Sequence, residues 1–100
     1  MQAQSVPLEV ALRHFLDERG RLTQFPAKRA MKLLACRYLQ GKLDKSRRYA
    51  EREISDALDE WTAFHDPATL RREMFDAGLL CRERDGSAYW VAPDEQANEQ

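Results

Sequence analysis

The sequence has few of the side chains that bind metal ions or form disulfides. It holds two cysteines and two histidines, and Cys36, Cys81, His14 and His65 are nowhere paired at the spacing of metal ligands. Two cysteines in a chain without a secretory signal fit a reducing cytoplasm, in which both remain free thiols. We therefore expect no metal site, no disulfide and no cysteine nucleophile.

Long apolar runs are also missing, so the sequence offers neither a membrane span nor the hydrophobic region of a signal peptide. It contains no glycine-rich phosphate loop, no nucleophile motif and no clustered pair of carboxylates. These absences argue against an enzyme and against a bound cofactor. We expect a cytoplasmic, non-catalytic protein that makes no contact with membranes.

An overall excess of positive charge is lacking too, because the 100 residues carry a formal net charge of only −1. The charges are unevenly distributed along the chain. Residues 21–53 hold ten lysines and arginines against three acids, whereas residues 54–100 hold four arginines against eleven acids. The middle third is therefore a basic block. The net charge of the whole chain, however, does not indicate a nucleic-acid partner.

The clearest structural signals lie between Phe64 and Trp90. Asp66 suits the cap of a helix, Pro67 suits its first position, and Gly78 suits the left-handed residue just after its end. These signals predict a helix over residues 67–77. Its inward face is expected to hold the apolar residues at helical spacing: Leu70, Met74 and Ala77.

A β-hairpin is predicted directly after this helix, because Asp85-Gly86 is a strong turn signal between two short strands. A two-residue turn places Arg82 opposite Tyr89 and Cys81 opposite Trp90, whereas a three-residue turn shifts these partners. With the shorter turn, Cys81 and Trp90 are expected to face the core. The predicted strands are Leu79–Arg84 and Ala88–Val91.

Three earlier helices are expected from apolar spacing and from proline and glycine at their ends. They run from Ser5 and Pro7 to Gly20, over Ala27–Gln40, and from Tyr49 to about Trp61. The second is expected to pack through Ala30, Met31, Leu34 and Tyr38, and the third through Ile54, Ala57, Leu58 and Trp61. Ala50 stands where a capping serine or threonine would partner Glu53.

These elements predict a winged helix-turn-helix, mainly α-helical with a small β-hairpin, preceded by an extra amphipathic helix. A plain three-helix bundle is the alternative, and the hairpin signal argues against it. Residues 1–20 are expected to pack on the domain or to pair with a second copy in a homodimer. Residues 21–92 form the domain, and residues 93–100 form an acidic tail that we expect to be disordered.

Several short motifs between Arg21 and Val91 resemble one prokaryotic family, the domain of unknown function numbered 2087. They are Phe25-Pro26-Ala27-Lys28, Tyr49 with Glu53-Ile54, Asp66 with Leu70-Arg71-Arg72, Gly78-Leu79-Leu80, and Asp85-Gly86 with Tyr89-Trp90. The resemblance implies a winged-helix-like domain that occurs alone or appended to helix-turn-helix transcriptional regulators. It implies no catalytic residues. Ala50 departs from the family pattern, in which threonine or serine is common.

Candidate nucleic-acid contacts lie first on the last helix and the hairpin. Arg71 and Arg72 flank the outer side of that helix, whereas Arg82, Arg84 and Tyr89 are expected to form a basic and aromatic face of the hairpin. A purely structural interpretation is also open for each. In this interpretation Arg71 supports the hairpin by pairing with a partly buried carboxylate. Arg72 forms an ion pair with Asp76, and Arg82 lies over the Tyr89 ring in a cross-strand contact.

Candidate phosphate contacts also lie in the basic block, both on its helix and in the following loop. They are Lys28, Arg29, Lys32, Arg47 and Arg48, accompanied by Lys42 and Lys45. A solvated charged face is the alternative interpretation of this block. If the block binds duplex DNA, the binding is expected to be weak and steeply dependent on salt.

The sequence thus favours a small transcriptional regulator that binds nucleic acid, with the basic block and hairpin as the expected contacts. A protein-interaction or sensor module on the same frame is the alternative. Glu73 and Asp76 on the last helix favour this second interpretation, because they would face phosphates unfavourably.

Overall fold

We analysed a computed structural model of the chain, which describes residues 7–93. The expected helix start at Ser5 and most of the expected tail at 93–100 lie outside the described residues. The elements in chain order are α1 (Leu8–Ala11), the 3-10 helix η1 (Arg13–Phe15), α2 (Arg29–Gln40), α3 (Glu51–Glu60), α4 (Pro67–Asp76), β1 (Leu80–Arg82) and β2 (Tyr89–Val91).

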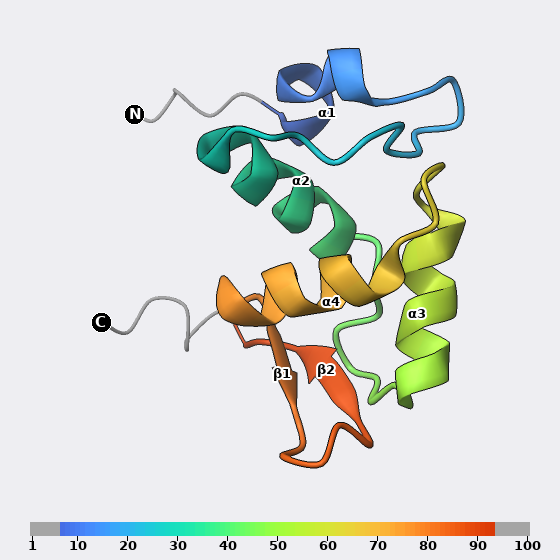
Figure 1. Ribbon diagram of the computed structural model, residues 1–100, viewed down its shortest axis with the longest axis vertical. Helices are drawn as coiled ribbons and strands as arrows, with labels where there is room; N and C mark the ends of the chain where they lie inside the picture. Colours follow the sequence, from blue (N-terminus) through green and yellow to red (C-terminus); the bar gives the residue numbers. More distant parts are fainter. Residues whose placement is uncertain (1–6, 94–100) are drawn as a thin grey trace.

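The elements form a winged helix-turn-helix in which α4 occupies the centre (Figure 1). α2 crosses one side of α4, α3 packs beside its N-terminal end, and the β1–β2 hairpin, called the wing below, lies on the side away from α2. α1 covers the far side of α2. The core lies where these elements meet, and its fully buried side chains include Leu39, Ile54, Leu58, Leu70 and Met74.

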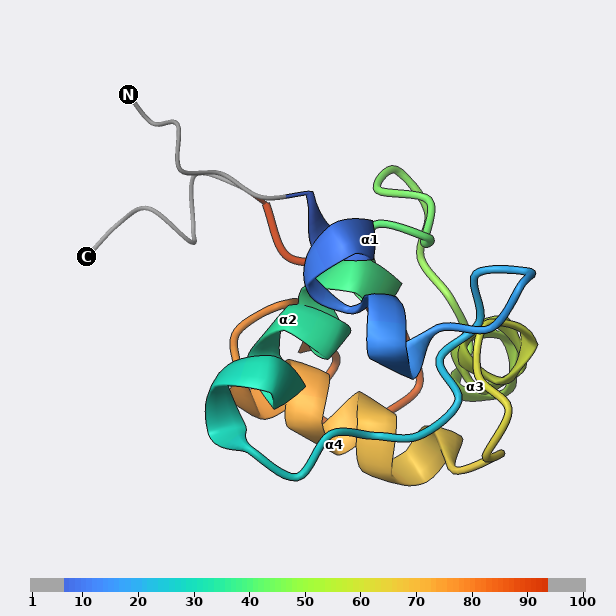
Figure 2. The ribbon, with the colours of Figure 1, turned by 90° about the horizontal axis from the view of Figure 1, so that it is seen from above.

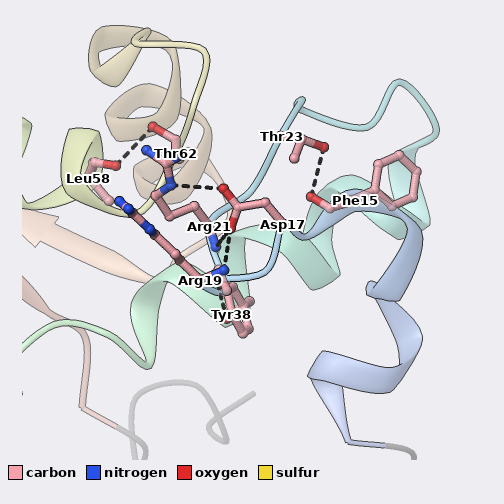
Figure 3. Close-up of polar contacts among 9 residues, drawn as sticks. Phe15, Asp17, Arg19, Arg21, Thr23, Tyr38, Leu58 and Thr62 are labelled. Atoms are coloured by element: carbon pink, nitrogen blue, oxygen red, sulfur yellow. Dashed lines mark hydrogen bonds and ion pairs between the residues drawn. The ribbon is translucent and has the colours of Figure 1, made fainter.

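The expected first helix up to Gly20 is wrong in its length. α1 ends at Ala11, the chain passes through η1, and it then reverses direction around Asp17 (Figure 3). Asp17 Oδ1 accepts hydrogen bonds from the backbone N–H groups of Arg19 and Arg21, at 2.9 and 2.8 Å. Aspartate offers the backbone such local hydrogen bonds, and here they hold the turn that follows η1.

The short first segment and its connector are nevertheless tied to the rest of the chain. Leu12 and Leu22 are fully buried. Leu22 forms isolated β-bridges opposite Leu16 and Thr62, and its own N–H and carbonyl bond to the Trp61 carbonyl and the Ala63 N–H, both at 2.8 Å. Tyr38 of α2 donates its hydroxyl to the Gly20 carbonyl at 2.7 Å (Figure 3). Seen from above, α1 lies directly over α2 (Figure 2), which agrees with the contacts between the two helices.

α2 begins at Arg29, two residues later than expected, and its buried side is rotated from the predicted one. The buried residues are Ala35, Cys36, Tyr38 and Leu39, whereas Ala30 is exposed and Met31 and Leu34 are half-buried. Of the predicted residues only Tyr38 is buried, and the other buried residues, Ala35, Cys36 and Leu39, were not in the predicted stripe. α2 is covered on two sides, by α1 and by α4, so its apolar positions do not form one narrow stripe.

α4 has the predicted capped start and glycine end. Asp66 accepts a hydrogen bond from the Thr69 N–H at 3.4 Å, and Pro67 fills the first helical position. At the other end Gly78 adopts φ = +79°, while Leu79 N–H bonds Met74 O and Gly78 N–H bonds Phe75 O, which is a Schellman motif. The helix ends at Asp76, and Ala77 is exposed rather than buried.

The wing has the predicted register. Leu80 pairs with Val91, Cys81 with Trp90 and Arg82 with Tyr89. The connection is longer than the two-residue turn that gave this register, because Glu83 N–H bonds Ala88 O and leaves residues 84–87 as the loop. A third backbone segment joins the sheet at Tyr49, which exchanges two hydrogen bonds of 2.8 Å with Tyr89.

The start of α3 leads to a first testable change. Glu53 Oε1 accepts the Ala50 N–H at 2.8 Å, but the methyl group of Ala50 has no oxygen to accept a helix N–H in return. Ala50 is exposed and extended, with φ −65° and ψ 161°, which suits a capping threonine. Ala50→Thr should raise the free energy of unfolding by about 0.5–1 kcal/mol, measured by urea denaturation.

Ala50→Val is the matched control, because valine has the shape of threonine without the hydroxyl. It should not stabilise the protein. A threonine variant that is no more stable than the valine variant would show that α3 does not need this cap.

The Asp17 turn generates a prediction about pH. The hydrogen bond from the Arg21 N–H is the main cause that lowers the pKa of Asp17, and the Arg21 guanidinium at 2.9 Å and the Arg19 N–H add to it. A carboxylate whose pKa is lowered by folding adds stability above its ordinary pKa of about 3.9, and this stability is lost as pH falls through the lower folded pKa.

Asp17→Asn should therefore lower the melting temperature most at neutral pH, and the difference from the natural protein should close below about pH 4. Glu18→Gln removes the same charge at an exposed neighbouring position and should show no such pH-dependent gap. Thermal unfolding followed by circular dichroism at several pH values measures both. An equal loss for Asp17→Asn at every pH would contradict a role of the charge.

Candidate nucleic-acid interface

The outer side of α4 and the adjoining strand β1 form a shallow groove with a basic and aromatic lining. We call it the α4–wing surface. Its residues are Ala68, Arg71, Arg72, Phe75, Asp76, Arg82 and Tyr89. Three arginines, one carboxylate and two aromatic rings thus meet in the region where a winged helix usually faces its target.

Phe75 and Arg82 are joined at the centre of this surface. The Arg82 guanidinium lies 4.7 Å from the centre of the Phe75 ring, and the ring is 38% exposed. Phe75 belongs to α4 and Arg82 to β1, so the contact holds the strand against the outer side of the helix. The predicted cover of Arg82 over Tyr89 is therefore wrong, because Arg82 lies on Phe75 instead.

Arg71 is the arginine that covers Tyr89. Its guanidinium lies 5.6 Å from the centre of that ring, and its Nη1 donates to the tyrosine hydroxyl at 3.1 Å. Nη1 also lies 3.3 Å from a carboxylate oxygen of Glu51, and the side chain of Arg71 is only 17% exposed. Arg71 therefore braces the wing as the structural interpretation expected, although Glu51 is a largely exposed carboxylate rather than a partly buried one.

The two faces of the wing are the reverse of the prediction. Leu80, Tyr89 and Val91 are buried against the helices, whereas Cys81 and Trp90 lie half-buried on the opposite face. Tyr89 is only 5% exposed, so its ring is not available to stack on a base. It belongs to the support of the α4–wing surface rather than to its contact area.

The remaining arginines of this region are exposed. Arg72 lies on the outer side of α4, and no ion pair joins it to Asp76 among residues 7–93, contrary to the structural interpretation. Arg84 lies at the tip of the wing, next to Asp85. The pKa of Asp85 is lowered by hydrogen bonds from the Ser87 hydroxyl and backbone N–H, so a negative charge stays at this tip near neutral pH.

Arg47 and Arg48, expected in the basic loop, are both engaged with other parts of the chain. Arg47 lies over the Tyr49 ring at 4.4 Å and pairs with Glu53 at 3.2 Å. Arg48 lies over the Trp90 ring at 4.1 Å and forms a close ion pair with Glu83 of the wing. The loop cations thus anchor α3 and the wing, which leaves less positive charge for an outside phosphate.

The cations of α2 lie apart from the α4–wing surface. Arg29 and Lys32 line a different groove, between α2 and the C-terminal half of α4. Lys32 Nζ is also 5.5 Å from the Phe25 ring, and Lys28 is exposed just before the helix. The chain therefore does not bring its candidate residues into one continuous basic face.

The contacts of Lys42 with two aromatic rings were also missed by sequence reasoning. Lys42 Nζ lies 4.8 Å from the Tyr38 ring and 4.4 Å from the Trp61 ring, so it sits between α2 and the end of α3. The helical spacing placed both rings on inward faces but gave no signal for a lysine from a loop. Within residues 7–93 no group of three or more potential metal ligands occurs, and no helix is long and apolar enough to cross a bilayer.

The contrast between two adjacent arginines can be tested. Arg71→Met should lower the free energy of unfolding by about 1–2 kcal/mol, because it leaves the buried Tyr89 hydroxyl without its partner. Arg72→Met, one residue further on and exposed, should change it by less than about 0.5 kcal/mol. Urea denaturation measures both.

A double-mutant cycle with Tyr89→Phe separates the hydrogen bond from general packing. The loss caused by Tyr89→Phe should be smaller when Arg71 is already methionine. Strictly additive losses would contradict the coupling.

A family model for an uncharacterized protein conserved in bacteria, DUF2087, matches residues 21–91. The match begins after α1 and η1 and includes α2, α3, α4 and the whole wing. Comparison with curated proteins and with solved structures found no match. The match covers well over half of the chain and confirms the resemblance expected from the motifs. The chain belongs to the DUF2087 family.

Proposed function

We propose that this chain is a non-catalytic transcriptional regulator that binds duplex DNA through the α4–wing surface. The observation that carries the proposal is the convergence of Arg72 and Arg82 beside the exposed ring of Phe75. In a winged helix this surface is the one that approaches the major groove, while the wing approaches the backbone. Arginine on such a surface serves both phosphates and base edges.

The contact area is smaller than the sequence suggested. Arg71 acts as a support for Tyr89, and Arg47 and Arg48 are paired within the chain. The principal contacts are then Arg72 and Arg82 of the α4–wing surface together with Arg84 at the tip of the wing. Three phosphate contacts correspond to a slope of about −3 in a plot of log affinity against log salt concentration. Binding that engaged the whole basic block would instead require six to ten contacts and a much steeper slope.

Asp76 opposes this binding. Its exposed carboxylate lines the same groove as Arg72 and Arg82, and a negative charge there repels a nearby phosphate. The proposal therefore includes weak binding by the isolated chain, and Asp76→Asn should strengthen it.

A second candidate is a protein-interaction or sensor module on the same frame. The exposed ring of Phe75 favours it, because aromatic rings and arginines are enriched in protein interfaces. Such a module would bind a protein partner in a stoichiometric complex and show no affinity for DNA.

The test is a fluorescence anisotropy titration of a labelled duplex of mixed sequence at low salt. The variant Arg72→Gln with Arg82→Gln should bind at least about tenfold more weakly, because it loses two of three phosphate contacts. Asp76→Asn should bind more tightly than the natural protein. Arg19→Gln with Lys45→Gln removes the same charge from two exposed sites outside the α4–wing surface and is the matched control.

Equal weakening by the control pair and by the α4–wing pair would mean that only net charge matters, which contradicts a defined interface. A duplex titration that stays flat at low salt for the natural protein and for Asp76→Asn would overturn the proposal and favour the protein-interaction module.

A further inference from the structure

A second groove runs between α2 and the C-terminal half of α4, on a side of α4 that the proposed DNA contacts do not use. Its lining combines small and apolar residues with charges of both signs. The residues are Ala27, Arg29, Lys32, Leu33, Cys36, Glu73, Asp76 and Ala77. In Figure 1 the two helices diverge toward the N-terminal end of α2 and the C-terminal end of α4. The residues that line the groove come mostly from these parts of the two helices.

The charges are separated by sign onto the two sides of the groove. Arg29 and Lys32 come from α2 and form a cationic side, whereas Glu73 and Asp76 come from α4 and form an acidic side. No ion pair joins the two sides among the described residues. The opposite charges therefore lie in one groove without neutralising each other in direct contact.

The lining also includes apolar side chains. Leu33 is 38% exposed, one of three large apolar side chains exposed among residues 7–93, and it lies on α2 next to Lys32. Cys36, which also lines the groove, is buried. Burial raises the pKa of Cys36 to about 11, the charge of Glu73 adds to this increase, and the charge of Lys32 opposes it. Charges from both sides of the groove therefore influence the pKa of the Cys36 thiol.

DNA does not fit this pattern, because the acidic side would repel phosphates as strongly as the cationic side attracts them. The pattern does fit a second copy of the same groove. A rotation of 180° about an axis along the groove brings the cationic side of one copy against the acidic side of the other.

The same rotation brings Leu33 of each copy, which lines the groove and is exposed, into the region where the two grooves face each other. We infer that the groove between α2 and α4 is the interface of a symmetric homodimer, held by two equivalent contacts between Arg29 and Lys32 of one chain and Glu73 and Asp76 of its partner. This interface differs from the dimer expected through residues 1–20, because Leu12 of that segment is fully buried within its own chain.

Charge reversal tests the inference without DNA. The cationic-side variant carries Arg29→Glu and Lys32→Glu, and the acidic-side variant carries Glu73→Lys and Asp76→Lys. Each alone places like charges against each other at both contacts, so each should raise the dimer dissociation constant by at least about a hundredfold. Sedimentation velocity over a range of protein concentrations measures this constant, and the natural protein should show a reversible dimer.

The decisive experiment is to mix the two charge-reversed variants. In a mixed dimer both contacts again join opposite charges, so an equimolar mixture should recover the dimer that neither variant forms alone. A single chain carrying all four substitutions should dimerise with itself for the same reason. Arg19→Glu with Lys45→Glu makes the same change of net charge as the cationic-side variant at exposed sites outside the groove, and it should leave the dimer intact.

Leu33→Glu is the second probe, since it changes one exposed residue and does not depend on the charged sides. It should also abolish the dimer while leaving the circular dichroism spectrum unchanged. A natural protein that remains monomeric at every concentration overturns the inference. So does a mixture of the two reversed variants that stays monomeric, or a dimer that survives Leu33→Glu. DNA affinity enters none of these outcomes, so they stand apart from the proposed function.

Discussion

The backbone pair between Tyr49 and Tyr89 is the contact on which the rest of the structure depends. Two hydrogen bonds of 2.8 Å fix the end of the α2–α3 loop to the second strand of the wing. The Tyr89 side chain then extends into the core beneath Arg71 of α4. One residue thereby connects the wing, the loop before α3 and the central helix, and the exposed surface is built around it.

The end of α4 sets the direction of the wing toward that surface. Gly78 adopts the left-handed conformation that ends the helix, and Leu79 folds back onto its last turn. β1 starts one residue later, so little freedom remains in the angle between helix and strand. This geometry places Arg82 over the ring of Phe75. The side chain of Gln40 in α2 also donates a hydrogen bond to the Leu79 carbonyl at 2.9 Å, which ties the start of the wing to α2.

The sequence predicted the wing register but not which side faces inward. The Asp85-Gly86 signal located the turn, and alternation placed Tyr89 and Trp90 on opposite faces. Alternation alone does not say which of two aromatic residues is buried. That choice was made by Arg71, which satisfies the tyrosine hydroxyl from a helix 18 residues away in the chain. The first helix was predicted too long from apolar spacing alone: it ends at Ala11, before the turn in which Asp17 accepts the backbone N–H groups of Arg19 and Arg21.

The candidate cations could be identified from the sequence, but their partners could not. Arg48 pairs with Glu83, which is 35 residues away in the chain, and Arg47 contacts the Tyr49 ring and pairs with Glu53. These basic residues of the loop therefore connect elements of the fold. A charge block predicts attraction to phosphate only if its charges remain unpaired after folding. Here that condition holds for α4 and β1 more than for the loop.

Asp76 links the two proposals, because it lines both the α4–wing surface and the groove between α2 and α4. In the monomer its charge faces any phosphate that approaches Arg72. In the inferred dimer the cationic side of the partner chain lies against it and offsets that charge. A duplex would then meet less repulsion from a dimer than from a monomer, and the linkage is reciprocal, so DNA would also favour the dimer. The acidic residues that argue against DNA binding by a single chain thus become the means by which assembly controls it.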